Sequence, residues 1–325
     1  MSDAAPLRQI TVAAGIIYRG QNELLLAQRP PKAHEEGWWE FPGGKLEAGE
    51  TPHQALVREL QEELDIEVLA SRPFMSIRHR YNDREVHLLV REVLRYQGEP
   101  RGAEGQPVRW VGAAELPQWR VLPADAPVIK ALRLPHQYVI TPDLAQQHSD
   151  LRSLHEALMR GLRRSLDLGL RLFQLRLPGI PTSDLLPLAR AAVAEVDAAG
   201  GRLLINHDIE LAQRSGAHGV HLKARQLSEL KQRPDAIDWL AASTHTAEEL
   251  SIAGQLQCDF VCVSPVRRTP SHAQATPLNW PGLAALLNSV NLPAYALGGV
   301  RLDDLDQARE AGAVGVAGIR GFWPL

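Results

Sequence analysis

Residues 44–66, GKLEAGETPHQALVRELQEELDI, contain a turn followed by a helix with an acidic stripe. Thr51 is a good N-cap residue, and the residues after it are good helix formers. At about 100° per residue, Glu59, Glu62 and Glu63 lie on one narrow face of that helix. Like charges at this spacing oppose the helix by about 0.2–0.5 kcal/mol per pair. Mg²⁺ binds carboxylate oxygens together with substrate phosphates, so the stripe is either a metal site or a solvated acidic face, and the residues around it favour the metal site.

Further residues stand at fixed positions around this stripe. A Gly43-Gly44 turn precedes it, Glu50 follows after five residues, and Arg58 follows after seven more. With these residues the stretch resembles a Nudix box, the signature of hydrolases that cleave nucleoside diphosphates linked to another group. We expect Glu50 and Arg58 to orient the turn and the helix by a charge-assisted pair, and we count Arg58 among the catalytic residues. The box's late glycine is Asp65, which should close the helix in the left-handed conformation at a cost in stability only.

The composition is that of a globular protein with two domains. The chain has 325 residues, 45% of them hydrophobic and 22% charged, and a formal net charge of −3. This charge argues against a large nucleic-acid surface, which needs clustered Lys and Arg. No signal peptide and no stretch of about 18 apolar residues is expected. Cys258 and Cys262 read as core thiols in a reducing compartment, so a cytoplasmic protein is expected.

The two halves of the chain have different patterns. Strand-like runs around the acidic helix predict an α+β sandwich. A stretch with four prolines, residues 115–136, then bridges to the second half, so the predicted domains are 1–134 and 135–325. The first half has candidate strands at 9–18, 22–27, 74–81, 86–94 and 108–111, and a short helix near 125–133.

The second half alternates strands with helical patterns. Eight such repeats in about 190 residues predict a compact (β/α)8 TIM barrel, so the fold class is α+β followed by α/β. The candidate strands are 137–141, 171–176, 202–205, 219–222, 239–243, 259–263, 294–297 and 314–317.

Hydrolysis of a pyrophosphate link needs its charge neutralised and a water aligned, and bound metal ions do both. The predicted ligands are the carboxylates of Glu59, Glu62 and Glu63 and the carbonyl group of Gly43. Mg²⁺ is the expected ion, with Mn²⁺ as an alternative. Glu104, in the loop GEPRGAEGQP, is a late ligand, a general base or a solvated loop carboxylate.

Within the Nudix class, residues 7–133 resemble the MutT-type 8-oxo-dGTP diphosphatases, which implies an α/β/α sandwich. The resemblance implies that Arg29 and His34 contact the phosphate and sugar, and that Glu104 is a late metal ligand. Trp38 and Trp39 are expected to pack beside the cleft. The residues expected to line the substrate cleft are Phe41, Pro42, Gly43 and Gly44. The likeness rests on AAGII at 13–17, FPGGKLEAGETP at 41–52, VRELQEEL at 57–64, GEP at 98–100, EGQP at 104–107 and PVI at 127–129.

The chain differs from the MutT family at the residue expected to bind the nucleotide base. Before PVI the MutT family has an asparagine that reads the oxidised base, and this chain has Asp125. An amide can donate to O6 and accept from N7–H of 8-oxoguanine, whereas an ionised carboxylate can only accept. Asp125 could compensate by being protonated in a dry pocket or by pairing with other N–H donors of the base. The alternative is that Asp125 caps the following helix.

Residues 137–320 resemble thiamine-phosphate synthase and the related TenI proteins. A phosphate-binding cup is expected at Gly298-Gly299 and Ala317-Gly318, after the last two strands. The likeness rests on YVITP at 138–142, QLR at 174–176, LIN at 204–206, GVHL at 219–222, STHTAEEL at 243–250, DFVCVSPV at 259–266 and ALGGV at 296–300.

The parts of the synthase that hold a metal-bound diphosphate are missing. The lysine after Gln-Arg is replaced by Leu177-Pro178, and the second lysine by His272. The two acidic ligands are replaced by His207 and Gln226. Synthase activity is therefore not expected. His207 and His272, with His245, remain candidates for proton transfer, and the alternative is a barrel that senses a ligand or is purely structural.

The leading hypothesis is Mg²⁺-dependent hydrolysis of 8-oxo-dGTP to 8-oxo-dGMP and pyrophosphate, which keeps the damaged base out of DNA. The barrel would then be degenerate or regulatory. One alternative is hydrolysis of thiamine-pathway diphosphates by the same chemistry. Another is a barrel that senses a phosphorylated, thiamine-related metabolite. The expected partners are a small nucleotide and such a metabolite, without direct binding of nucleic acid or membrane.

Overall fold

The computed structural model describes residues 8–20, 22–31, 35–148, 150–269 and 275–324. The chain divides into two compact units. The first comprises residues 1–133 with 288–291, and the second comprises the remainder. Among the described residues, no helix has both the length and the apolarity needed to cross a membrane.

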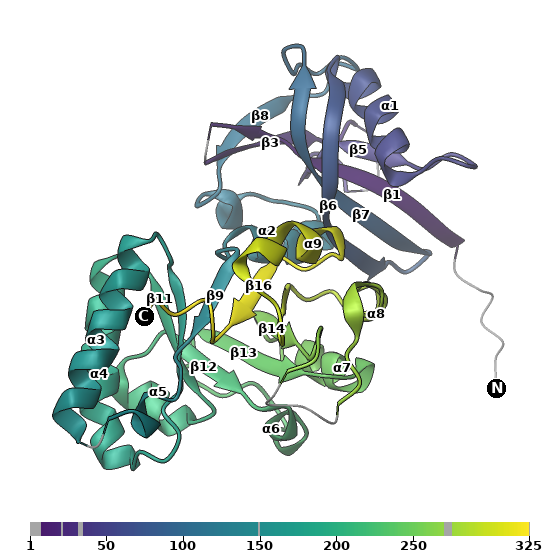
Figure 1. Cartoon of the computed structure of the whole chain (residues 1–325). Coiled ribbons are helices and arrows are strands. Elements are labelled where there is room, and N and C mark those ends of the chain that lie inside the picture. Colours follow the sequence, from purple (N-terminus) through teal and green to yellow (C-terminus); the bar gives the residue numbers. More distant parts are fainter. Residues whose placement is uncertain (1–7, 21, 32–34, 149, 270–274, 325) are drawn as a thin grey trace, which may run out of the picture. The chain divides into compact units, whose positions relative to one another are not determined.

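The first unit is built from two sheets and one long helix (Figure 1). One sheet has the strand order β5-β1-β7-β6, and the other has the order β2-β3-β4 with β8 paired to β3. β1 runs parallel to β7 and antiparallel to β5. The elements are β1 (Arg8–Ile16), β2 (Tyr18–Arg19), β3 (Glu23–Gln28), β4 (Trp39–Glu40), β5 (Gly43–Lys45), α1 (Pro52–Leu64), β6 (Glu67–Arg80), β7 (Arg84–Gln97), β8 (Val108–Gly112) and α2 (Ala126–Leu132).

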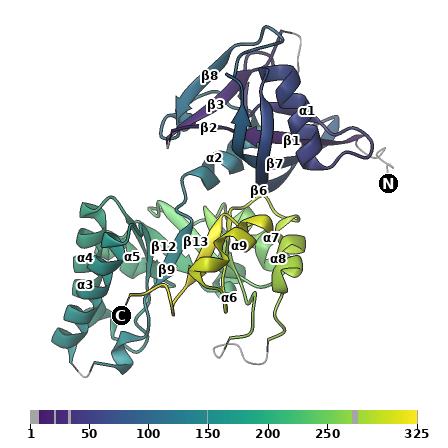
Figure 2. The same cartoon turned by 45° about the horizontal axis from the view of Figure 1, so that its top comes forward.

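Helix α1 packs its apolar face onto the core of this unit. Leu56 and Leu60 are fully buried against Ala13 of β1, Leu25 of β3 and Val93 of β7. Residues of both sheets therefore contribute to one core, and Figures 1 and 2 show α1 lying along β1 and β6. Because the apolar face is fixed inward, Glu59 and Glu63 of the acidic stripe turn toward β5.

The second unit is a closed barrel of eight parallel strands, all of them in the described part of the chain, in the order β10-β11-β12-β13-β14-β15-β16-β9. Helices cover its outside, and α3, α4 and α5 lie together there (Figure 2). The strands are β9 (Gln137–Ile140), β10 (Leu172–Leu175), β11 (Arg202–Asn206), β12 (Gly219–Leu222), β13 (Trp239–Thr244), β14 (Phe260–Val263), β15 (Ala294–Ala296) and β16 (Gly315–Gly318). The helices are α3 (Leu151–Asp167), α4 (Thr182–Ala198), α5 (Ile209–Ser215), α6 (Ala224–Glu229), α7 (Ala247–Gln255), α8 (Asn279–Leu287) and α9 (Leu305–Glu310).

The predicted sandwich and the predicted barrel are both present. The strand predicted over 74–81 was too short, since β6 begins at Glu67 and carries irregular register toward β7. The short strands β4 and β5 were not predicted, because glycines and prolines dominate their surroundings. Cys258 and Cys262 are buried free thiols, as expected.

Candidate functional site

The acidic helix begins and ends at the residues that its sequence indicates. Thr51 Oγ1 accepts from the amide of Gln54, and the Gln54 side chain accepts from the amide of Thr51, which completes a capping box. Asp65 ends the helix in the left-handed conformation, with φ 56° and ψ 40°. Its carboxylate also accepts from Arg101, at 2.6 Å from Nη2. Asp65, which stands where the Nudix box has a glycine, therefore adopts the left-handed conformation that was predicted for it.

Arg58 fastens the turn before the helix to the helix itself. Its Nε and Nη2 atoms donate to the two carboxylate oxygens of Glu50 at 2.8 and 2.9 Å. Nη2 also donates to the carbonyl oxygen of Lys45, and Nη1 donates to Glu59 at 2.9 Å. Arg58 lowers the pKa of Glu50 to about 2, chiefly by these side-chain hydrogen bonds. The expected Glu50–Arg58 pair is present and is bidentate.

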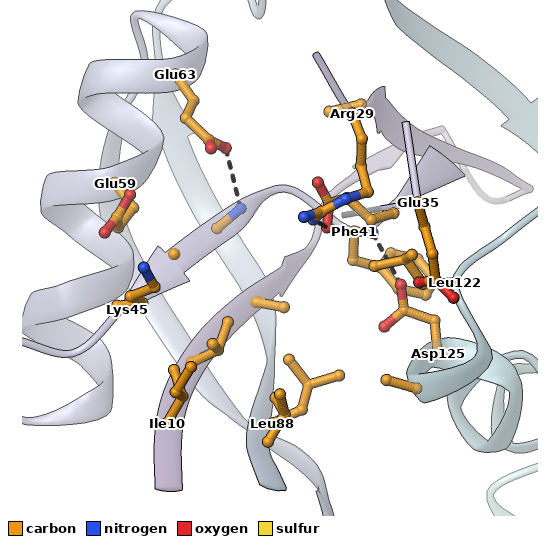
Figure 3. A pocket seen from close by; sticks show the side chains of 18 of the residues that line it. Ile10, Arg29, Glu35, Phe41, Lys45, Glu59, Glu63, Leu88, Leu122 and Asp125 are labelled. Carbon is orange, nitrogen blue, oxygen red and sulfur yellow. Dashed lines mark hydrogen bonds and ion pairs between the residues drawn. The ribbon is translucent and has the colours of Figure 1, made fainter. Parts of the chain in front are cut away.

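Two glutamates of α1 lie against the glycines of β5 (Figure 3). A Cβ atom on Gly44 would lie 2.1 Å from the carboxylate carbon of Glu59. The amide of Gly43 donates to Oε2 of Glu63 at 3.1 Å. Glycine at position 44 thus leaves the room in which the Glu59 carboxylate lies.

Glu63 lies in a strongly acidic environment. Burial and, to a smaller extent, the charges of Glu40, Glu59 and Glu104 together raise its pKa to about 8, against the opposing effect of the Gly43 amide. The loop that carries Glu104 is tied to the same residue, because the amide of Ala103 and the side chain of Gln106 both donate to the carbonyl oxygen of Glu63.

These residues line one cavity of about 610 Å³. Glu59 and Glu63 lie on one side of it, and Asp125 lies on the other beside Leu122 and Phe41 (Figure 3). Several lining residues were not predicted from sequence, because strands distant along the chain bring them together. They are Glu35, Glu40, Lys45, Tyr81, Arg84 and Gln106.

Asp125 is a buried carboxyl group, with 3% of its surface exposed. It precedes α2 but its side chain makes no capping hydrogen bond, which speaks against the alternative that Asp125 caps this helix. Its Oδ2 instead accepts from the amide of Phe41 at 3.4 Å. Burial, helped by the nearby charge of Glu40, raises the pKa of Asp125 to about 8.

The other residues predicted for the cleft divide into two groups. Phe41 and Arg29 line the cavity, and Nη1 of Arg29 pairs with Glu40 at 2.5 Å. Pro42 is not among the lining residues, and its carbonyl oxygen accepts from the amide of Gly15. His34 lies outside the described residues.

Neither tryptophan of the predicted pair lines the cavity. Trp39 packs edge-on against Trp119 with 4.9 Å between ring centroids, and Arg120 lies over Trp38. These contacts agree with packing and not with a stacking platform for a base.

The donor chemistry of the cavity fits a hard divalent cation. Glu59, Glu63 and Glu104 line it together, and the pKa of Glu63 is raised first by burial and then by the neighbouring carboxylates, whose charge a cation would neutralise. Glu62 is outside the lining, with 56% of its side chain exposed, and lies 3.5 Å from Arg58. Within the described ranges, no three His, Cys, Asp or Glu side chains lie close enough together to hold a metal ion as they stand. Glu59 and Glu63 are instead held by Arg58 and by the Gly43 amide.

In the barrel, the predicted histidines occupy strand ends. His207 follows β11 and His245 follows β13, whereas His272 lies outside the described residues. Nδ1 of His245 lies 2.7 Å from the carbonyl oxygen of Ser264. The predicted cup residues Gly298-Gly299 follow β15, and Ala317-Gly318 end β16.

One barrel histidine was not singled out from the sequence. His221 is buried inside the barrel, and its two ring nitrogens lie 3.2 Å from the Tyr138 hydroxyl and 2.9 Å from the Ser243 hydroxyl. Gln174 donates to the same Tyr138 hydroxyl. Burial lowers the pKa of His221 to about 3, so it is a neutral, fully partnered residue of the core.

The two units are similar to different known proteins. Residues 8–132 match the family described as NUDIX domain, and residues 138–322 match the family described as Thiamine monophosphate synthase. The first part is 41% identical over 127 residues to an 8-oxo-dGTP diphosphatase of Escherichia coli (strain K12), covering 39% of this chain and 98% of the relative. It is 39% identical over 125 residues to a CTP pyrophosphohydrolase of the same organism, covering 38% of this chain and 92% of that relative. The second part is 30% identical over 196 residues to a thiamine-phosphate synthase of Thioalkalivibrio sulfidiphilus (strain HL-EbGR7), covering 59% of this chain and 89% of the relative.

Proposed function

Because the chain belongs to the Nudix hydrolases through residues 8–132 and to the thiamine monophosphate synthase family through residues 138–322, we propose that its first domain hydrolyses 8-oxo-dGTP. The products would be 8-oxo-dGMP and pyrophosphate, and the role would be the removal of an oxidised nucleotide from the pool. We place this domain at residues 1–134 and the barrel domain at 135–325.

The burial of Asp125 is the observation that carries this substrate. With a pKa of about 8, the carboxyl group holds its proton at neutral pH. A protonated carboxyl has one O–H donor and one carbonyl acceptor, as an amide has one donor edge and one acceptor. It can therefore donate to O6 and accept from N7–H of 8-oxoguanine. Ordinary guanine has a lone pair at N7, which would face the carbonyl oxygen, so the same pairing disfavours dGTP.

The acidic side of the cavity is the proposed metal site. Glu59, Glu63 and Glu104, with the carbonyl group of Gly43, would hold Mg²⁺, or Mn²⁺ in its place. Glu62 would have to turn from Arg58 toward the cavity to join them as a ligand. When bound, such an ion neutralises phosphate charge and lowers the pKa of a water molecule. Arg58 would keep Glu59 in place through the contacts that it already makes with Glu50 and Lys45.

The remaining lining residues would hold the nucleotide. Arg29 would bind the phosphate and sugar portion, and its pairing with Glu40 fixes its position in the cavity. Phe41 would hold the base beside Asp125, since its amide already contacts that carboxyl group. The backbone of Gly43 and Gly44 would line the path between base and metal.

CTP is the second candidate substrate. A protonated Asp125 can donate to N3 and accept from the N4 amine of cytosine, so its hydrogen-bonding pattern fits this base as well. A relative with 39% identity is a CTP pyrophosphohydrolase, which supports the same alternative. The substrate must therefore be decided by measurement and not by pairing alone.

The deciding experiment measures kcat/KM for 8-oxo-dGTP, dGTP and CTP with Mg²⁺, using the full-length protein, Glu63→Gln and the control Glu67→Gln. Glu67 is exposed on β6, so Glu67→Gln makes the same chemical change at a position outside the cavity. We expect 8-oxo-dGTP to be preferred, and Glu63→Gln to lower kcat by about 10² or more while Glu67→Gln does not. A preference for CTP would replace the proposed substrate. Absence of activity on all three nucleotides would reject both candidates, and thiamine-pathway diphosphates would then be assayed in the same way.

For the barrel domain we propose that the synthase reaction is absent. His207 and Gln226 stand where acidic metal ligands are expected, and Gln226 is already engaged, since it donates to the carbonyl oxygen of His207. An assay for condensation of the two synthase substrates should give no product with the full-length protein. Product formation above that of a heat-inactivated sample would contradict this proposal.

A further inference from the structure

Positively charged side chains follow the ends of two barrel strands, β10 and β12, which lie on either side of β11. Arg176 comes directly after β10, and Lys223 comes directly after β12, with Arg225 two residues later. β11 lies between these strands and ends just before His207. Carboxyl ends of parallel strands meet at one edge, where neighbouring strands are about 4.8 Å apart. Three cations thus gather at one side of the barrel mouth.

These three cations lack a compensating carboxylate. Across the described parts of the chain, no Asp or Glu lies within ion-pair distance of Arg176, Lys223 or Arg225. Other arginines of the barrel domain are paired, such as Arg163 with Glu195 and Arg267 with Asp304. The pKa of Lys223 is lowered by burial first and then by the charges of Arg225 and Arg176. Lys223 is therefore near enough to both arginines to be repelled by them.

The backbone that carries these cations is fixed by side-chain hydrogen bonds. Gln226 accepts from the amide of Lys223 at 2.9 Å and donates to the carbonyl oxygen of His207 at 3.0 Å, which joins the loops after β12 and β11. The Thr141 hydroxyl accepts from the amide of Arg176 at 2.8 Å and donates to its carbonyl oxygen at 2.9 Å. A cluster held in this way loses little entropy when it binds a ligand.

The same place does not suit a metal ion. The acidic residue nearest in sequence to His207 is Asp208, whose Oδ1 is engaged in capping α5 by accepting from the amide of Leu211 at 2.8 Å. The pKa of His207 is lowered by burial and by Lys223, so this side chain adds little charge at neutral pH. Uncompensated cations without carboxylate ligands favour an anion over a cation.

We propose that Arg176, Lys223 and Arg225 bind the phosphate group of a small molecule directly, without a divalent cation. Phosphate oxygens accept charge-assisted hydrogen bonds from both guanidinium and ammonium groups. The carboxyl edge of the barrel strands is where barrels place their ligands. This site is distinct from the cavity of the first domain, so it stands whether or not 8-oxo-dGTP is the substrate there.

The test is calorimetric titration of the full-length protein with inorganic phosphate and with pyrophosphate in the presence of EDTA. The variants are Lys223→Gln, Arg225→Gln and the double variant, and the control is Lys231→Gln, an exposed lysine of the same domain. We expect binding without metal, weakened about tenfold or more by each single change and unaffected by the control. Tighter binding of one probe identifies the ligand as a monophosphate or a diphosphate.

Two results would overturn the proposal. One is an unchanged dissociation constant in the double variant, which would place the anion elsewhere, for example in the first domain. The other is a failure of the wild-type protein to bind either probe at millimolar concentration unless Mg²⁺ is added. Arg225 is exposed, so Arg225→Gln should keep the fold even where the double variant does not.

Discussion

The carboxylate of Glu59 lies against Gly44 so closely that a single methyl group at position 44 would meet it at 2.1 Å. Since the end of a glutamate side chain can swing away, this contact constrains the position of the carboxylate more than the stability of the fold. The glycine thus controls where one proposed metal ligand lies. Gly43 acts on Glu63 in a second way, through its amide.

Gly44→Ala should therefore lower activity without unfolding the protein. We expect kcat for nucleotide hydrolysis to fall by about tenfold or more, because the new Cβ displaces Glu59, while the melting temperature changes little. Gly49→Ala is the matched control. Gly49 has φ +87° with open space around it, so alanine there should cost about 1 kcal/mol in stability and leave kcat unchanged. The interpretation fails if both variants lose activity equally.

The Glu50–Arg58 pair should make stability depend on acid pH. The pKa of Glu50 is lowered to about 2, so the pair stabilises the folded state above the ordinary glutamate pKa and loses that effect as pH falls toward 2. Thermal melts of the wild type should show a loss over this range that is smaller in Glu50→Gln. Arg58→Lys should also melt at a lower temperature near pH 7, because lysine cannot make the bidentate contact. Equal acid sensitivity of wild type and Glu50→Gln would exclude this role.

Asp65→Gly should stabilise the first domain. Asp65 holds φ 56°, which costs an ordinary residue about 1 kcal/mol and glycine almost nothing. The variant loses the ion pair with Arg101, but that pair is exposed, at 46% for Asp65 and 72% for Arg101, and contributes little. Chemical denaturation should show the gain in the free energy of unfolding. Arg101→Ala measures the pair alone, and a large loss there would reverse the expected sign.

The features that the sequence predicted are those set by local chemistry. Thr51 and Asp65 bound the helix because caps depend on a few neighbouring residues, and the strands of the barrel follow from apolar runs. The Glu50–Arg58 pair was predictable because both residues lie in one short segment.

What could not be predicted depends on contacts between distant segments. Asp125 lies among prolines and looks like a helix cap, but in the structure it is a buried acid that accepts from the amide of the distant Phe41. Glu40 joins the same cavity through the short strand β4, which has no clear strand pattern. Lys223 and Arg176 are 47 residues apart in numbering and become neighbours only when the barrel closes.

Asp125→Asn should change how stability depends on pH. The wild-type acid has a pKa of about 8 when folded and its ordinary, lower value when unfolded. Stability from its protonated form is therefore fully present below the unfolded pKa and is lost as pH rises toward 8, at up to about 1.4 kcal/mol per pH unit. Asparagine keeps the size without the proton, so the variant should gain stability relative to wild type between pH 5 and 8. Asp167→Asn, an exposed change of the same kind, should not.

The same substitution should separate base reading from fold stability. As pH rises through about 8, the wild-type carboxyl ionises and the oxygen facing O6 of 8-oxoguanine loses its proton, while the amide of the Asp125→Asn variant keeps its donor. The ratio of kcat/KM for 8-oxo-dGTP in Asp125→Asn to that in wild type should therefore increase with pH. Because both proteins share the same metal site, the ratio removes pH effects on the attacking water. A ratio that stays constant from pH 6 to 9 would show that Asp125 does not read the base through its proton.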